Sequence, residues 1–144
     1  MNSTAVMTRD VVVVASGVTV GGAAAMMKKR HIRHLPVVEG RRLIGIISDR
    51  DLLSHPSEST CAEVMTPAPV TCAPGASVSR VAGLMLEHRI DSVPIVDVAG
   101  RLVGLVTSTD LLGLLIDRDE AQMLPFDFRI RMAASDRDTL ALAA

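Results

Sequence analysis

Along this chain, short apolar runs typical of strands alternate with segments in which apolar residues recur at helical spacing. The same order of segments occurs twice. Each half opens with a short β-branched run, which is typical of a buried strand. A turn with Gly17, or with Pro74 and Gly75, comes next, and apolar residues then recur at helical spacing. Two more apolar runs and a second helical pattern complete each half. The pattern predicts the order β-α-β-β-α twice, an α/β (α+β) fold.

The predicted elements lie at equivalent places in the two halves. Thr19 and Ser77 are the expected N-caps of the first helices. Expected strands cover residues 11–14, 35–39 and 43–48 in the first half, and 70–72, 93–98 and 102–107 in the second. The apolar stripes of the first helices are Val20, Ala23, Ala24 and Met27, and Val78, Val81, Ala82 and Met85.

The two halves are an internal duplication. An offset of 58 places Val6-Met7-Thr8 on Val64-Met65-Thr66, and after one inserted residue an offset of 59 places Arg42-Leu43 on Arg101-Leu102. Two copies of this length are too few and too long for a solenoid, so we expect a paired module with pseudo-two-fold symmetry. We place the first repeat at residues 1–56, the second at 57–116 and a C-terminal tail at 117–144. Thr60 and Glu63 predict a capping box at the start of a small helix.

The composition excludes several classes of function. Hydrophobic residues make up 49% of the 144 residues and the net charge is −1, which is neither a disordered nor a nucleic-acid-binding profile. The two aromatic residues are Phe126 and Phe128, so stacking platforms for single strands are absent before them. No uncharged run reaches the roughly 18 residues of a membrane span. We expect a cytoplasmic protein that binds neither membrane nor nucleic acid.

The sequence gives little support for a metal site or a catalytic site. Cys61 and Cys72 have no metal-ligand spacing and are expected to be small buried or half-buried side chains. His31 and His34 are three residues apart, but the helix is expected to end between them, which argues against a metal site. The cations of residues 28–30 are expected at a helix C-terminus. No nucleophile has a base and an orienting group in a known setting, so we predict no catalytic residues and no enzyme.

One ordered motif occurs in both repeats: an apolar-Pro-apolar-Val run, a turn, and then L-h-G-h-h-[ST]-x-x-D-L-L. It runs from Leu35-Pro36 to Asp51 and from Val93-Pro94 to Asp110. With the leading Val-Met-Thr, this resembles a tandem pair of CBS (cystathionine β-synthase) domains, a Bateman module, over roughly residues 3–116. The resemblance implies a stand-alone module with two symmetry-related clefts that bind AMP, ADP, ATP or a related adenosine compound, and a homodimer.

The residues Ser48-x-x-Asp51 and Thr107-x-x-Asp110 allow two interpretations. Each lies where a strand runs into a helix, so a hydroxyl and a carboxylate could simply cap the helix. A carboxylate can also accept hydrogen bonds from the two hydroxyls of a ribose, which is the role that the resemblance implies.

The resemblance also implies that each cleft combines this box with residues of the other repeat. The favoured cleft would consist of Thr107, Asp110, Arg33, His34, Ile32, Leu35, Pro36, Val12, Val13 and Gly17. The second cleft would consist of Ser48, Asp51, Val70, Thr71, Ala76, Ile90, Asp91, Ser92 and Val93.

The residues before the two prolines make the predicted clefts unequal. Arg33 and His34 could contact phosphates, whereas Asp91 would repel them. We therefore expect the cleft with Thr107 and Asp110 to take the phosphorylated nucleotide, with or without Mg²⁺. Adenine would lie between aliphatic side chains and bind backbone groups.

The tail departs from the resemblance. Residues 126–132 alternate strictly between apolar and polar, which predicts a strand. Such a strand either folds back on its own domain or contacts a second chain.

The sequence as a whole predicts a regulatory sensor in which nucleotide binding shifts a conformational equilibrium that an unknown regulated protein reads. The alternative is a ligand-independent dimerisation and assembly module with no obligatory cofactor.

Overall fold

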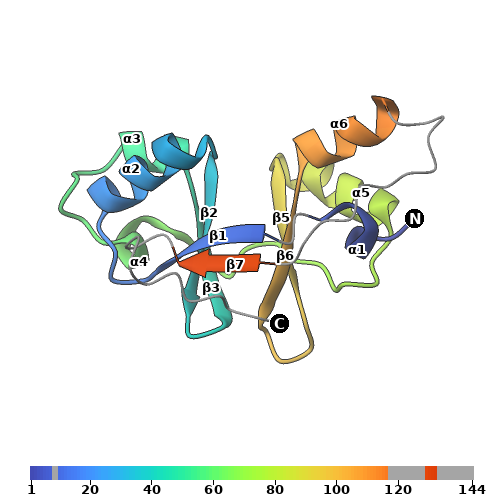
Figure 1. The fold of residues 1–144 in the computed structure, drawn as a ribbon, viewed down its shortest axis with the longest axis horizontal. Coiled ribbons are helices and arrows are strands. Elements are labelled where there is room, and N and C mark those ends of the chain that lie inside the picture. The colour runs from blue at the N-terminus through green and yellow to red at the C-terminus, as the bar shows by residue number, and fades with distance from the viewer. Residues whose placement is uncertain (8–9, 117–128, 133–144) are drawn as a thin grey trace. The chain divides into compact units, whose positions relative to one another are not determined.

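The computed structural model describes residues 1–7, 10–116 and 129–132 (Figure 1). They belong to two compact units, which we name after a strand of each. The β2 unit comprises Val12–Pro69 and residues 130–132; the β5 unit comprises Met1–Val11 with residues 70–116 and 129. The elements are α1 (Ser3–Val6), β1 (Asp10–Ala15), α2 (Val20–Arg30), β2 (His34–Glu39), β3 (Arg42–Ser48), α3 (Asp49–Leu53), α4 (Cys61–Val64), β4 (Thr66–Pro67), α5 (Val78–His88), β5 (Ser92–Val96), β6 (Leu102–Thr107), α6 (Ser108–Ile116) and β7 (Arg129–Met132).

A five-stranded sheet in the order β4-β3-β2-β1-β7 forms the β2 unit. β1 runs parallel to β2, and β2 and β3 form an antiparallel hairpin. Gly40 has a φ of 61° at the hairpin turn, a backbone conformation that glycine adopts without strain. The buried core of this unit consists of Val14, Val20, Ala23, Met27, Leu35, Val37, Ile47, Leu52, Cys61 and Val64.

The β5 unit is built on the antiparallel hairpin of β5 and β6. Helices α5 and α6 lie against each other and against this hairpin. Its buried core consists of Val6, Met7, Cys72, Val81, Leu84, Met85, Val93, Ile95 and Val106. None of the helices in residues 1–7 and 10–116 has the length and apolarity to span a bilayer.

Each unit contains the short helix that opens the other repeat. α1, from the first repeat, lies in the β5 unit, where Ser3 Oγ donates to the carbonyls of Ala73 and Pro74 at 3.0 and 2.9 Å. α4, from the second repeat, lies in the β2 unit, where Cys61 N donates to Val18 O at 2.7 Å. Ser3 and Cys61 are equivalent at the offset of 58, and both are fully buried. The compact units therefore exchange their opening segments and do not coincide with residues 1–56 and 57–116.

The structure bears out most of the predicted elements. Thr19 and Ser77 cap α2 and α5, each accepting a hydrogen bond from the backbone three residues on. The predicted strand at residues 70–72 is wrong, because Cys72 makes only an isolated bridge to Ile95. Ala24 is also exposed, not part of the buried stripe of α2.

The predicted capping box of α4 is wrong in its hydrogen bonds. Thr60 is the N-cap residue, but its side chain accepts no bond from the helix backbone. The hydroxyl donates instead to Glu63 Oε1 at 3.1 Å. The two side chains therefore satisfy each other, and the helix start depends on backbone contacts with the loop before α2.

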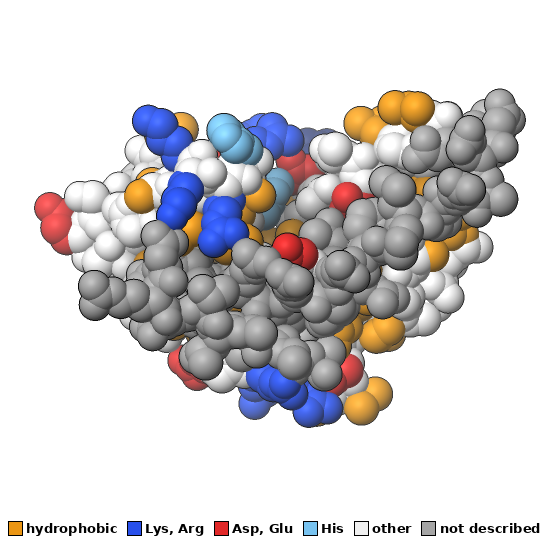
Figure 2. All heavy atoms as spheres, viewed as in Figure 1, with side chains coloured by type: hydrophobic (Ala, Val, Ile, Leu, Met, Phe, Trp, Pro, Cys, Tyr) orange, Lys and Arg blue, Asp and Glu red, His pale blue; other side chains and the backbone are white. Residues whose placement is uncertain are grey.

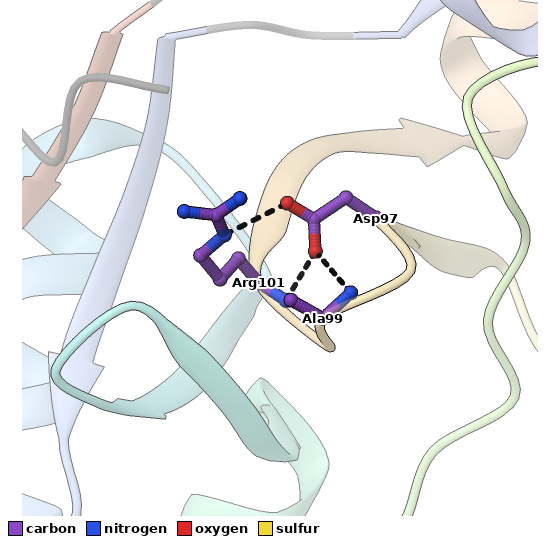
Figure 3. Close-up of polar contacts among 3 residues, drawn as sticks. All are labelled: Asp97, Ala99 and Arg101. Atoms are coloured by element: carbon purple, nitrogen blue, oxygen red, sulfur yellow. Dashed lines mark hydrogen bonds and ion pairs between the residues drawn. The ribbon is translucent and has the colours of Figure 1, made fainter.

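A compact turn closes the hairpin of β5 and β6 (Figure 3). Asp97 Oδ1 accepts from the backbone N–H groups of Ala99 and Arg101, both at 2.9 Å, and Oδ2 accepts from Arg101 Nε at 2.9 Å. The backbone hydrogen bond from Arg101, followed by its side-chain bond and the bond from Ala99, holds the pKa of Asp97 below its ordinary value. Gly100 supplies the positive φ, 81°, that this turn needs.

Candidate functional site

The box at Ser48 and Asp51 lies where β3 runs directly into α3. Ser48 N donates to Asp51 Oδ2 at 2.8 Å, and Asp51 N donates to Ser48 Oγ at 3.3 Å. Both side chains are half-buried. The capping interpretation of this box is therefore confirmed. One oxygen of the Asp51 carboxylate accepts a backbone hydrogen bond in this cap.

The second box, between β6 and α6, repeats this geometry. Thr107 N donates to Asp110 Oδ2 at 2.8 Å, and Asp110 N donates to Thr107 Oγ1 at 3.2 Å. Capping and ligand binding are compatible at both boxes, since a carboxylate has lone pairs on two oxygens. A ribose would have to use the oxygen that does not cap the helix.

The residues before each proline lie beside the box of their own repeat. His34 is the sheet partner of Ser48, and Asp49 N donates to Arg33 O at 2.9 Å. Directly opposite residues in antiparallel strands have Cα atoms about 5 Å apart. The β2 unit thus brings Arg33 and His34 together with Ser48 and Asp51.

The β5 unit repeats this relationship with different chemistry. Ser92 is the sheet partner of Thr107, and Ser108 N donates to Asp91 O at 2.9 Å. Asp91 is exposed and Ser92 is buried. The unit therefore brings two carboxylates, those of Asp91 and Asp110, to one end of its hairpin.

Asp49 is a charged residue at this site that the sequence analysis did not consider. It is the first residue of α3, and its Oδ1 accepts from Arg50 N at 3.0 Å. The equivalent residue of the second repeat is Ser108. The sequence shows the difference at the two inner positions of the boxes, where Ser-Asp-Arg-Asp has a carboxylate and a guanidinium and Thr-Ser-Thr-Asp has two hydroxyls.

The apolar residues predicted at the clefts divide by burial. Among those predicted for the favoured cleft, Leu35 and Val13 are 0% exposed, as is Val93 of the second cleft. These side chains serve the protein interior, so only their backbone groups could reach a ligand. Pro36 is buried as well, whereas Gly17 is exposed and the half-buried members are Val12, Ile32, Val70, Thr71, Ala76 and Ile90.

The combination of residues from two repeats in one cleft remains a prediction. Thr107 and Asp110 belong to the β5 unit, whereas Arg33, His34 and Val12 belong to the β2 unit. Within its own unit each box meets the pre-proline residues of its own repeat. The geometry inside the units thus adds an arrangement that the sequence analysis did not weigh.

Cationic side chains gather over the end of α2, where Figure 2 draws blue and pale blue atoms. Lys28, Lys29 and Arg30 form the last turn, and His31 closes the helix in a left-handed conformation with a φ of 54°. These cations complement the partial negative charge at a helix C-terminus. The helix ends at Arg30, slightly before the predicted place, with His31 as its C-cap. Residues 1–7 and 10–116 contain no cluster of three or more His, Cys, Asp or Glu side chains suited to a metal ion.

Both cysteines are free thiols, and their burial agrees with the buried or half-buried side chains expected from the sequence. Burial raises the pKa of the Cys61 thiol to about 11. Burial also raises the pKa of Cys72, although the nearby Arg80 guanidinium opposes the shift. Neither thiol is activated as a nucleophile, which requires a lowered pKa.

This site geometry is that of a tandem α/β module with one helix-capping Ser/Thr-Asp box in each repeat. The sequence model of the CBS domain matches residues 4–58 and 61–117. The chain therefore belongs to the CBS domain family and carries the domain twice, as the duplication indicated.

Curated relatives match the chain over about three quarters of its length. The inosine-5'-monophosphate dehydrogenase of Nitrosopumilus maritimus is 36% identical over 110 residues, which are 76% of this chain and 23% of the dehydrogenase. That of Mycobacterium tuberculosis strain H37Rv is 38% identical over 113 residues, 76% of this chain and 21% of the dehydrogenase. The chain spans less than a quarter of the length of these relatives, so the similarity does not extend to the dehydrogenase as a whole.

Solved structures of CBS domain pairs have the same fold. The CBS domain pair of protein MJ0100, in complex with 5'-methylthioadenosine and S-adenosyl-L-methionine, is 30% identical with a TM-score of 0.77 and covers 82% of this chain and 98% of that one. The cytosolic domain of the Mg²⁺ channel MgtE in complex with ATP is 33% identical with a TM-score of 0.68 and covers 75% and 46%. CBSX2 in complex with AMP is similar in fold, with a TM-score of 0.76, 23% identity, and coverage of 83% and 98%.

Proposed function

We infer that this chain is a regulatory module that binds an adenosine compound. The observation that carries this proposal is the pair of equivalent boxes, each presenting a half-buried carboxylate of which one oxygen caps a helix. A ribose diol suits the other oxygen, since two adjacent hydroxyls can donate to a single carboxylate. Support comes from the MJ0100 domain pair and the MgtE domain, whose structures contain adenosine compounds and which are 30% and 33% identical to this chain.

Two assignments of the phosphate contacts fit this proposal. The sequence-based assignment joins Thr107 and Asp110 with Arg33 and His34 of the other repeat, and the second cleft then joins Ser48 and Asp51 with Asp91. The other assignment joins Arg33 and His34 with Ser48 and Asp51 of their own repeat. It is supported by the backbone contacts of Arg33 and His34 inside the β2 unit.

Charge within the units favours the second assignment. The β2 unit offers Arg33 and Arg50 beside Asp49 and Asp51, so that the opposing charges balance. The equivalent positions of the β5 unit hold two carboxylates, Asp91 and Asp110, and two hydroxyl residues, Ser108 and Thr109. A phosphate group is repelled less by the balanced set.

Titration calorimetry with AMP and ATP on two carboxylate variants separates the assignments. If the sequence-based assignment holds, Asp110→Ala abolishes the tighter binding event and Asp51→Ala leaves it. If the phosphate binds at the box of the β2 unit, the two variants exchange these outcomes. Glu58→Ala is the control, because it removes an exposed carboxylate that belongs to neither box. Each variant's melting temperature checks that the loss of a cap has not unfolded the protein.

The proposed regulation is a shift between two conformations that differ in ligand affinity. A regulated protein would read that shift, and a homodimer is the proposed assembly. The competing function is an assembly module without a ligand. A thermal-shift series with AMP, ADP, ATP, NAD and S-adenosylmethionine, each with and without Mg²⁺, distinguishes the two, since a ligand that binds only the folded state raises the melting temperature. No shift with any of these compounds would favour the assembly module, and light scattering would then report the oligomer.

A further inference from the structure

The tail contributes strand β7, which neighbours β1 at the edge of the five-stranded sheet (Figure 1). It falls within the predicted range of residues 126–132, of which residues 126–128 lie outside the described part. Residues 130–132 belong to the β2 unit.

Strand β1 is paired with β2 over only part of its length. The partners of β1 in β2 are limited to Val14↔Val37 and Ala15↔Val38, so Val12 and Val13 have no partner there. Strand residues need a hydrogen-bonded neighbour, and the other neighbour of β1 is β7. Strand β7 is therefore the sheet neighbour available to this part of β1.

The second repeat supplies a natural comparison. Its segment equivalent to β1, residues 70–72, is not a strand and is attached to β5 only through the Cys72 bridge. The described sheet of the β5 unit has two strands, β5 and β6, and none in the position of β7. Pro69, which takes the place of Val11, also lacks an N–H to donate. Among the described residues, one of the two homologous segments thus has an added neighbouring strand and the other has none.

We propose that β7 is a positioning element that preorganises Val12 and Val13 for the adenosine ligand. This inference rests on the proposed function, in which Val12 and Val13 line one ligand site and Val70 and Thr71 line the other. Val13 is fully buried and Val12 half-buried, so the contacts would come from the Val12 side chain and from backbone groups. Backbone groups already held in a strand lose little conformational freedom when a ligand binds them. The site lined by Val12 and Val13 therefore binds the adenosine compound more tightly than the site lined by Val70 and Thr71, because only the first has β7 beside it.

Two proline variants test the proposal in the full-length chain. N–H groups along a strand point to its two edges in turn, so one of Ile130→Pro and Arg131→Pro removes a donor facing β1 and the other removes a donor facing away. The effective variant should weaken AMP or ATP binding by about tenfold or more, since fixing the backbone of one residue changes an equilibrium by roughly that factor. The other variant is the matched control, and Ile130→Ala and Arg131→Ala account for the side chains.

Hydrogen exchange provides a second measurement that a general loss of stability would not reproduce. The effective variant should speed exchange at whichever of the Val12 and Val13 amides faces β7, while the amides of Val37 and Val38 in β2 keep their protection. Calorimetry well below the melting temperature then measures affinity in a folded protein. A merely structural role for β7 would lower the melting temperature without changing affinity.

The outcomes separate this inference from the proposed function. Equal affinity in the wild type and both proline variants overturns the inference and leaves nucleotide binding intact. Tighter binding in the effective variant also overturns it, because β7 would then compete with the ligand. If AMP, ATP and S-adenosylmethionine all fail to bind the wild-type chain, the proposed function fails and the ligand role of β7 fails with it.

Discussion

Met7 packs against Gly104, which belongs to the other repeat. A Cβ added to Gly104 would lie 2.4 Å from Met7 Sδ and 2.9 Å from its Cγ. The reciprocal contact joins Met65 and Gly45, where the added Cβ would lie 2.3 Å from the sulfur. The motif glycine of each repeat is thus small because the Met of the other repeat's opening segment occupies the space of its side chain.

We predict that Gly104→Ala destabilises the protein by about 1–3 kcal/mol, the usual cost of overpacking a core. Met7 is only 3% exposed and cannot move aside freely. Chemical denaturation followed by circular dichroism measures the change.

Gly83→Ala is the matched control for this variant. It lies in the interior of α5 with no atom within 4 Å of the added Cβ, so it should raise stability through the higher helix propensity of alanine. Combining Gly104→Ala with Met7→Ala should recover part of the loss attributed to the clash. If Gly104→Ala is neutral by itself, the close contact with Met7 does not limit the size of this side chain.

The contact also illustrates what the sequence could and could not predict. The repeat aligned Met7 with Met65 and Gly45 with Gly104, because both pairs are local features of each copy. It could not disclose that Met7 contacts Gly104, since packing across repeats leaves no period in the sequence. Residues 70–72 failed as a strand for a related reason: strand formation depends on a neighbour, and β7 lies beside β1 in the other unit.

The candidate site was also predictable only in part, in its local features and not in its contacts between strands. The boxes at Ser48 and Thr107 follow from a strand-to-helix junction, so their caps were foreseen from the sequence. The adjacency of His34 and Ser48 depends on the hairpin register, which includes a shift between Val37 and Val38 that no spacing rule indicates.

The two caps should be measurably stabilising. We predict that Ser48→Ala and Thr107→Ala each cost about 0.5–2 kcal/mol, because each removes the acceptor for an N–H at a helix start. Ser48→Thr keeps a hydroxyl and should cost less. Thermal denaturation without ligand makes the comparison, and equal stability of Ser48→Ala and the wild type would mean that water replaces the hydroxyl without loss.

Asp97 should make the β5–β6 turn sensitive to acid (Figure 3). Hydrogen bonding holds its folded pKa below the ordinary value of 3.8. A lowered carboxyl pKa stabilises the folded state above the unfolded value, and that contribution disappears as the pH falls through the folded pKa. Asp97→Asn should therefore be less stable than the wild type at pH 7, with the difference shrinking below pH 3.8.

The control for the acid prediction is Glu58→Gln, an exposed carboxylate in the segment before α4. Urea denaturation between pH 2.5 and pH 7 compares the three proteins. A constant difference between Asp97→Asn and the wild type over this range would show that the charge of Asp97 does not contribute to stability.

Cys61 should limit stability at the opposite end of the pH scale. Its folded pKa is about 11, raised by burial from 9.0, so the folded state keeps the thiol neutral after the unfolded thiol has begun to ionise. A raised pKa gives stability that is fully present below the unfolded value and is lost as the pH rises to the folded one. Between pH 9 and pH 11 the wild type should therefore lose more stability than Cys61→Ala. At pH 8, Ellman's reagent should label Cys61 only after unfolding, and fast labelling of the native protein would contradict its burial. An equal loss of stability with rising pH in the two proteins would contradict the raised pKa.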